Sequence, residues 1–74
     1  MRLTVKLFAT FREGRFKTRT MEIASGRTVG DLIATLGLPE ASLGVMLVNG
    51  RHVELDHVLR DGDLCSIFPK IGGG

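Results

Sequence analysis

The sequence predicts one small α+β domain in which a single helix packs on a mixed sheet of about four to five strands. Three observations predict this fold class. Apolar and polar residues alternate near both ends of the chain, one stretch in the middle has helical periodicity, and an Asn-Gly pair marks a tight turn. A length of 74 residues leaves room for one domain, and an apolar content of 43% is that of a folded protein.

The first third of the chain predicts a β-hairpin. Residues 2–8 alternate strictly and place Leu3, Val5 and Leu7 on one face, as in a half-buried strand. Residues 9–16 contain Gly14 and several charged side chains, which is typical of a loop. Residues 17–24 alternate again, so the two alternating segments are expected to pair.

The middle of the chain predicts one short helix. Thr28 is a suitable N-cap, and Asp31 completes an acidic variant of the capping box. Gly37 suits the left-handed position after a helix, and Pro39 prevents the helix from resuming. The apolar stripe has the spacing i, i+3, i+4 and i+7 and consists of Val29, Leu32, Ile33 and Leu36.

The last third predicts three further strands. Residues 45–48 form an apolar strand, and Asn49-Gly50 is among the clearest signals for a two-residue hairpin turn. A short strand near 51–54, a loop and a final strand over 64–68 follow, and Pro69 ends the final strand. This order of elements is that of the β-grasp fold. We therefore expect a β-grasp domain over residues 1–69 and a flexible tail over residues 70–74.

Several classes of site are excluded or disfavoured by the composition. A single cysteine rules out an internal disulfide and a multi-cysteine zinc site. Cys65 lies in the middle of the last strand, so we expect a small buried side chain with a raised thiol pKa and low reactivity. His52 and His57 have no third ligand nearby, and we expect no metal site there.

Targeting signals and charge favour a cytoplasmic protein. The apolar runs are too short to span a bilayer, and the chain starts directly in an alternating segment instead of a signal peptide. Basic residues are concentrated in residues 1–30, but Arg15, Lys17 and Arg19 alternate as on the solvent face of a strand. We therefore expect neither a nucleic acid nor a membrane as a partner.

Three stretches resemble the MoaD/ThiS family, the ubiquitin-like small subunits of molybdopterin synthase and the sulfur carriers of thiamin synthesis. They are the Leu-Phe-Ala-Thr-Phe-Arg-Glu run at 7–13, the two segments 48–50 and 59–63, and the ending over 67–74. The ending is the most specific part, because a proline after the last strand is followed by a terminal Gly-Gly. Two residues depart from the family pattern: Lys70 replaces a second proline, and Gly72 replaces an alanine or serine.

The resemblance implies a sulfur carrier that is not itself an enzyme. In this family a partner enzyme uses ATP to adenylate the C-terminal carboxylate, here that of Gly74. The carboxylate then becomes a thiocarboxylate that donates sulfur. The carrier binds no cofactor of its own. The molybdopterin pathway is favoured, with an acceptor like the large subunit of molybdopterin synthase. The alternatives are thiamin synthesis with a thiazole synthase-like acceptor, a modifier joined to lysines, and a β-grasp binding module that never uses its terminus.

The expected site combines the tail with an apolar patch. The resemblance implies that Gly74 reacts, while Gly72 and Gly73 let bare backbone pass through a narrow channel. Residues 69–74 reach about 20 Å when extended. Alternation predicts that Leu47 and Phe68 point outward beside each other and dock a partner. The other expected tail contacts are Pro69 and Ile71, and the candidates for a charged rim are Arg12, Arg60 and Lys70.

Overall fold

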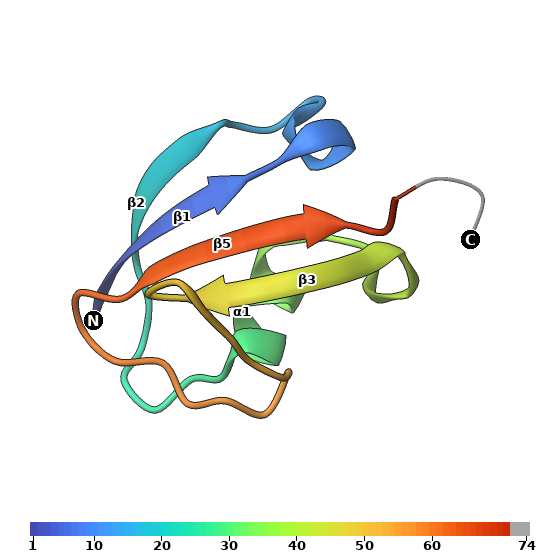
Figure 1. The fold of residues 1–74 in the computed structure, drawn as a ribbon. Coiled ribbons are helices and arrows are strands. Elements are labelled where there is room, and N and C mark those ends of the chain that lie inside the picture. Colours follow the sequence, from blue (N-terminus) through green and yellow to red (C-terminus); the bar gives the residue numbers. More distant parts are fainter. Residues whose placement is uncertain (72–74) are drawn as a thin grey trace.

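The computed structural model describes residues 1–71 and shows a mixed five-stranded sheet with the strand order β2-β1-β5-β3-β4 (Figure 1). The strands are β1 (Arg2–Leu7), β2 (Thr18–Glu22), β3 (Leu43–Val48), β4 (Arg51–His52) and β5 (Leu64–Pro69). The α-helix is α1 (Val29–Leu36), and two 3₁₀ helices are η1 (Ala9–Arg12) and η2 (Glu40–Ser42). The predicted fold class is therefore correct.

The first and last strands lie side by side in the middle of the sheet. β1 and β5 run parallel, whereas β1 pairs with β2, and β3 pairs with both β4 and β5, in antiparallel fashion. α1 lies behind the sheet in the view of Figure 1. Among the described residues no helix covers the opposite face, which we call the open face.

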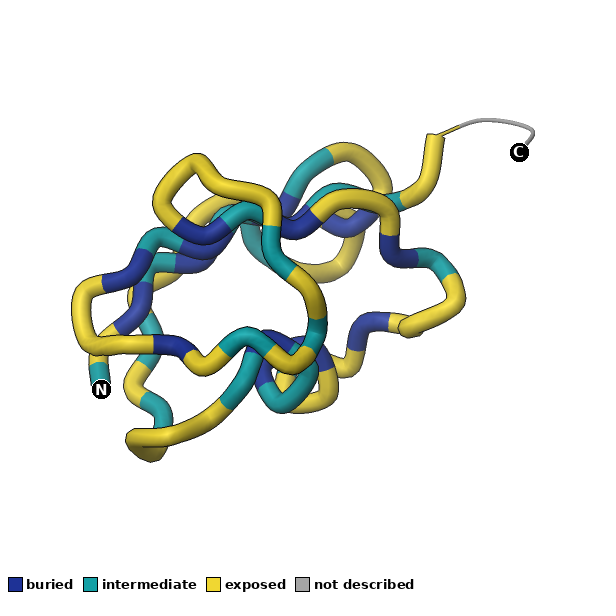
Figure 2. Tube along the Cα trace, turned by 60° about the horizontal axis from the view of Figure 1, so that its bottom comes forward, coloured by how far each residue is buried: buried dark blue, intermediate teal, exposed yellow. Residues whose placement is uncertain are grey.

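The core lies between the sheet and α1 (Figure 2). Leu3, Val5 and Leu7 have no exposed surface, which confirms the alternation of the first strand. Burial of such side chains is worth roughly 1.5–3 kcal/mol each before conformational entropy is subtracted. The other core side chains are mainly aliphatic and include Val29, Leu32, Ile33, Leu38, Leu43, Met46, Val48, Leu59, Cys65 and Ile67.

The ends of α1 have the geometry that the sequence predicts. The backbone N–H of Asp31 donates to Thr28 Oγ1 at 3.2 Å, and the Thr28 N–H donates to Asp31 Oδ2 at 2.9 Å. These hydrogen bonds to Thr28 stabilise the ionised carboxylate and lower the pKa of Asp31. Gly37 closes the helix in the left-handed region, with φ of 68°. A capped helix of 8 residues still needs its docked apolar face, because it is too short to be stable alone.

The Asn-Gly turn and the loop before β5 form one clamp. Asn49 and Gly50 both have positive φ, 53° and 80°, as the predicted hairpin turn requires. The Asn49 side chain donates to Asp63 Oδ1 at 2.9 Å and accepts the N–H of Leu64 at 2.9 Å. The backbone N–H of Arg60 donates to Asp63 Oδ2 at 2.9 Å. Segments 48–50 and 59–63, which resemble the MoaD/ThiS family, therefore have a structural role: their hydrogen bonds fix where β5 begins.

Two local predictions are wrong. Residues 9–16 are not simply a loop, because η1 turns back and buries Phe11, which is 4% exposed, against the core. The short strand β4 ends at His52 and does not reach residue 54. The Val53 N–H still donates to the Met46 carbonyl, but the chain then turns toward α1, where the Leu55 carbonyl accepts from the Gly30 N–H at 2.8 Å.

Arg15, Lys17 and Arg19 are exposed, and Arg19 lies on the opposite face of the sheet from the polar residues of β1. Arg19 pairs with Val5 in the β1–β2 register, so its side chain lies on the same side of the sheet as α1. Its guanidinium stacks 4.3 Å from the ring of Phe16. Within the described residues no helix is long and apolar enough to cross a membrane.

Candidate functional site

The start of the C-terminal tail at Pro69 and Lys70, which we call the tail root, is held by the start of β3. Leu43 pairs with Pro69, and the register shifts between Leu43 and Val45 through a bulge at Gly44. Just beyond the strand, the Lys70 N–H donates to the Ser42 carbonyl at 2.9 Å. The backbone of the chain is therefore positioned up to Lys70, one residue further than the proline that the sequence marks as the end of order.

Gly44 is required for this close approach. A Cβ on Gly44 would lie 2.6 Å from the Pro69 carbonyl oxygen, 2.8 Å from its carbon and 3.0 Å from the Lys70 nitrogen. All three are backbone atoms, which cannot move aside as a flexible side chain would. The glycine thus lets β3 and the tail root lie in contact, and the sequence analysis did not identify it.

An apolar groove opens on the sheet beside the tail root. It has a volume of about 580 Å³ and is lined by Gly44, Val45, Leu47, Phe68, Pro69, Lys70 and Ile71. Val45 is 42% exposed and Ile71 is 93% exposed. Large exposed apolar side chains that gather at one place mark a surface that buries them in a complex.

The structure brings the predicted residues Leu47 and Phe68 into this groove. Both point away from the core, because their neighbours Met46, Val48 and Ile67 point into it. They lie on the neighbouring strands β3 and β5, where Phe68 is opposite Val45 and Leu47 is opposite Ser66. The alternative that Phe68 folds over the edge of the core does not hold. Predictions for Gly72, Gly73 and Gly74 fall outside the described residues.

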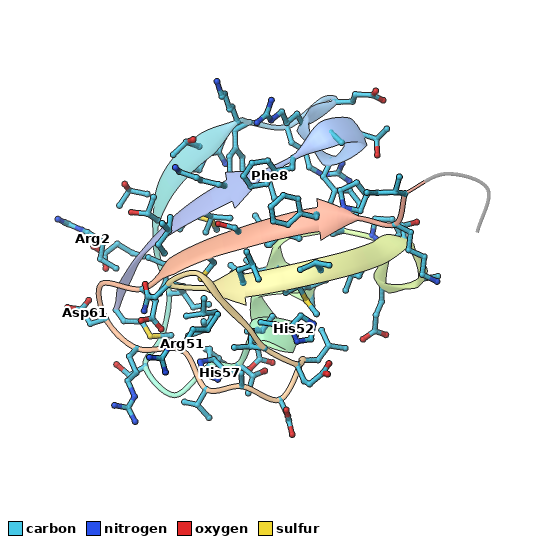
Figure 3. All side chains as sticks on the ribbon, in the orientation of Figure 1. Arg2, Phe8, Arg51, His52, His57 and Asp61 are labelled. Carbon is cyan, nitrogen blue, oxygen red and sulfur yellow. The ribbon has the colours of Figure 1, made fainter. Side chains whose placement is uncertain are left out.

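Phe68 is fixed on the open face by a stack that the sequence analysis missed. The rings of Phe8 and Phe68 are parallel within 12°, with centroids 4.1 Å apart. The Arg12 guanidinium lies 5.3 Å from the centroid of Phe8, and its Nε donates to the Leu7 carbonyl at 2.7 Å. Phe8 points forward from the end of β1 in Figure 3. The alternation of β1 already places residue 8 opposite the buried face, but only the pairing of β1 with β5 brings it to Phe68.

The predicted charged rim is correct in part. Lys70 lines the groove. Arg12 lies near it, because its guanidinium is over the ring of Phe8, which stacks on Phe68. Arg60 does not belong to this rim. It precedes β5, at the opposite end of that strand, and lines a separate hollow with Asn49 and Asp63.

Cys65 is placed as predicted, on the core side of β5. It is 2% exposed, and burial together with the neighbouring Asp63 carboxylate raises the pKa of its thiol to about 11. A thiol of this kind is protonated at neutral pH, so it is a poor nucleophile.

In the part of the chain that the structure describes, the two histidines do not form a metal site with other side chains. Figure 3 shows His52 and His57 on the β4 side of the molecule, away from Phe8. Within residues 1–71, no group of three or more His, Cys, Asp or Glu side chains has a geometry for holding a metal ion.

Comparison with known proteins identifies relatives of this fold. A family model described as the ThiS family matches residues 5–74. A comparison with curated proteins finds no match. A solved structure of a putative molybdopterin converting factor, subunit 1, from Pyrococcus furiosus is 30% identical, with a TM-score of 0.78 over 96% of this chain and 99% of its own.

Two other solved structures are also similar. SAMP1, a small archaeal modifier protein from Haloferax volcanii, is 27% identical, with a TM-score of 0.76 and all of both chains covered. A complex of subunits 1 and 2 of the molybdopterin-converting factor from Helicobacter pylori contains a chain that is 22% identical, with a TM-score of 0.68 and both chains fully covered. The last likeness shows the fold alone. Together these structures confirm the ubiquitin-like β-grasp fold.

Proposed function

The chain belongs to the ThiS family of ubiquitin-like sulfur carriers, and we propose that Gly74 is its reactive residue, adenylated and then converted to a thiocarboxylate that donates sulfur. The observation that carries the proposal is the apolar groove at the tail root. The groove gives a partner a place to bind at the point where the chain leaves the sheet toward Gly74.

The chemistry requires little of the carrier. A carboxylate oxygen of Gly74 attacks the α-phosphorus of ATP in the partner's active site and pyrophosphate leaves, which forms an acyl-adenylate. A sulfide-level sulfur donor then attacks the carbonyl carbon and displaces AMP, which leaves a thiocarboxylate. The carrier contributes the carboxylate and the docking surface, while the activating enzyme binds ATP. We therefore propose that this chain is not an enzyme and holds no cofactor of its own.

Molybdopterin synthesis in the cytoplasm is the pathway that we favour. The 30% identity to a putative molybdopterin converting factor subunit over 96% of this chain supports it. The subunit complex from Helicobacter pylori supports a partner of the large-subunit type. In our proposal this acceptor covers the groove around Phe68, while the tail enters its active site.

A second function is favoured by the likeness to SAMP1, a modifier protein. In that role the acyl-adenylate of Gly74 would end as an amide bond to a lysine of another protein. Both functions use the same activation step, so neither the groove nor the glycine ending separates them.

Intact-mass measurement of the chain recovered from its native cells tests the proposal. We expect a fraction in which one oxygen is replaced by sulfur, and no such fraction in a variant extended by one alanine after Gly74. Adducts on lysines of other proteins, with no sulfur-bearing fraction, would support the modifier instead. The proposal is overturned if only unmodified chain is found and deletion of Gly74 leaves cofactor synthesis intact.

A further inference from the structure

We propose that the free edge of β2, together with the groove between β2 and α1, binds an acidic segment of a partner protein in extended conformation. The segment would add to the sheet as an extra strand beside β2. This surface lies on the helix side of the sheet, opposite the open face, and is independent of the function proposed for Gly74.

The backbone of β2 has hydrogen-bonding groups available along its outer edge. β2 is at one end of the strand order, and Figure 1 shows no strand of the described chain beyond it. The Leu7 N–H donates to the Lys17 carbonyl, and the Ile23 N–H donates to the Met1 carbonyl. Odd-numbered residues of the hairpin therefore bond to β1. In an antiparallel pair the alternate residues, here Thr18, Thr20 and Glu22, point their N–H and C=O groups outward.

A groove runs beside this edge on the helix side. Two hollows lie along it and share Thr35 of α1 in their linings. The first is lined by Gly14, Arg15, Phe16, Arg19, Met21, Thr35 and Leu36, and the second by Glu22, Ile23, Ala24, Arg27, Asp31, Ala34 and Thr35. Half-buried apolar side chains form the floor, so every second side chain of an added strand would meet apolar surface.

The charges beside the groove favour an acidic partner. Arg15, Lys17 and Arg19 are exposed at the end where β2 begins. None of them forms an ion pair within the described residues, because the one salt bridge there joins Arg2 and Glu22 at the other end of the strand. Arg19 is held in place by its stacking on Phe16. An arginine whose side chain is already ordered loses less conformational entropy when it binds a carboxylate than a mobile side chain does.

The same charges select among possible occupants. A second copy that paired with β2 in antiparallel fashion would place its own Glu22 end beside the basic cluster, and Glu22 already pairs with Arg2. A single-stranded nucleic acid would find the cations but would leave the outward backbone groups of β2 unused. An extended acidic peptide satisfies the backbone edge, the apolar floor and the charges together.

NMR titration with a synthetic probe tests the proposal on the full chain. The probe is a peptide in which valine and threonine alternate, with a run of aspartates at one end. The control peptide has lysines in place of the aspartates. We expect saturable shifts at Thr18, Thr20 and Leu36, no shifts at Val45 or Phe68, and no binding of the control. Binding should weaken as salt is added.

Two pairs of variants separate strand addition from simple charge attraction. Arg19→Glu should weaken binding about tenfold, whereas Arg51→Glu on the far strand β4 should change it less than about twofold. Thr20→Pro removes an outward N–H without removing a bond to β1, so it should abolish binding, while Thr20→Ala should keep it. Unchanged melting curves would show that these variants fold.

The proposal is overturned by any of five results, four of them from the titrations. These four are the absence of saturable shifts with the acidic peptide, shifts confined to the open face, full binding by Thr20→Pro, and equal shifts with a single-stranded oligonucleotide. Dimer formation through β2 in sedimentation experiments would also overturn it. None of these results bears on the reactivity of Gly74, which the intact-mass experiment measures.

Discussion

Phe68 lines the apolar groove and is not part of the hydrophobic core. Its ring stacks on Phe8 at 4.1 Å and lines the apolar groove, while the next residue inward, Ile67, is 1% exposed. An aromatic pair of this kind contributes about 0.5–1.5 kcal/mol beyond the area that it buries. Its larger contribution is expected in the complex, because central aromatic residues carry much of the energy of an interface.

We predict that Phe68→Asp weakens binding of the large-subunit-type partner by at least about 2 kcal/mol, or roughly 30-fold, in titration calorimetry. The free energy of unfolding should fall by only about 1 kcal/mol, through loss of the stack on Phe8. Val58→Asp is the matched control, because Val58 is 52% exposed and lies outside the groove. Loss of the cooperative melt in Phe68→Asp would show instead that Phe68 belongs to the core.

The element that matters most for the tail is the bulged start of β3. Most strand ends fray, but here the pairing of Leu43 with Pro69 and the bond from Lys70 to Ser42 extend order past the last strand. Both depend on Gly44, which has no Cβ to strike the Pro69 backbone. The exit direction of the tail is thus a property of β3 as much as of β5.

We predict that Gly44→Ala destabilises the domain by about 1–3 kcal/mol, as overpacking does elsewhere, and loosens the tail root. Urea denaturation measures the first effect. Faster hydrogen exchange at the Lys70 amide measures the second. Ser42→Ala is the control, because it changes the neighbouring side chain but keeps the carbonyl that accepts from Lys70. Equal exchange rates at Lys70 in Gly44→Ala and the native chain would contradict this role.

The whole domain depends on a small core in which Cys65 is one of the buried residues. With 74 residues, a single core of this size rarely supplies more than about 3–5 kcal/mol of net stability. A change of a few kcal/mol at one buried group therefore changes the fraction of folded protein. The raised pKa of Cys65 connects that stability to pH.

We predict that the domain loses stability as pH rises from about 9 to about 11. The pKa of Cys65 is about 11 in the folded chain against an ordinary 9.0, so the unfolded chain releases this proton first. Unfolding is then favoured by up to about 2–3 kcal/mol at the top of this range. Urea melts at several pH values measure the loss, and Cys65→Ala, which cannot titrate, should show a flatter pH dependence. Equal slopes in the two chains would contradict the assignment.

Much of the fold could be predicted because its signals are local. Alternation identified β1 and the inward residues of β3 and β5, and the capping box of Thr28 identified α1. The Asn49-Gly50 pair identified its turn. The 3₁₀ helix at Ala9–Arg12 was missed, because a single buried aromatic, Phe11, has no periodicity to reveal it.

The sequence by itself determined the order of the strands and α1 along the chain, the outward direction of Leu47 and Phe68, and the family to which the glycine ending points. Only the tertiary structure decided which outward residues meet. The stack of Phe8 on Phe68 needs β1 and β5 to be neighbours, and the role of Gly44 needs β3 to touch the tail root. The free edge of β2 depends on the strand order. Periodicity and turn residues act over a few positions, whereas these features arise from contacts between residues far apart in the chain.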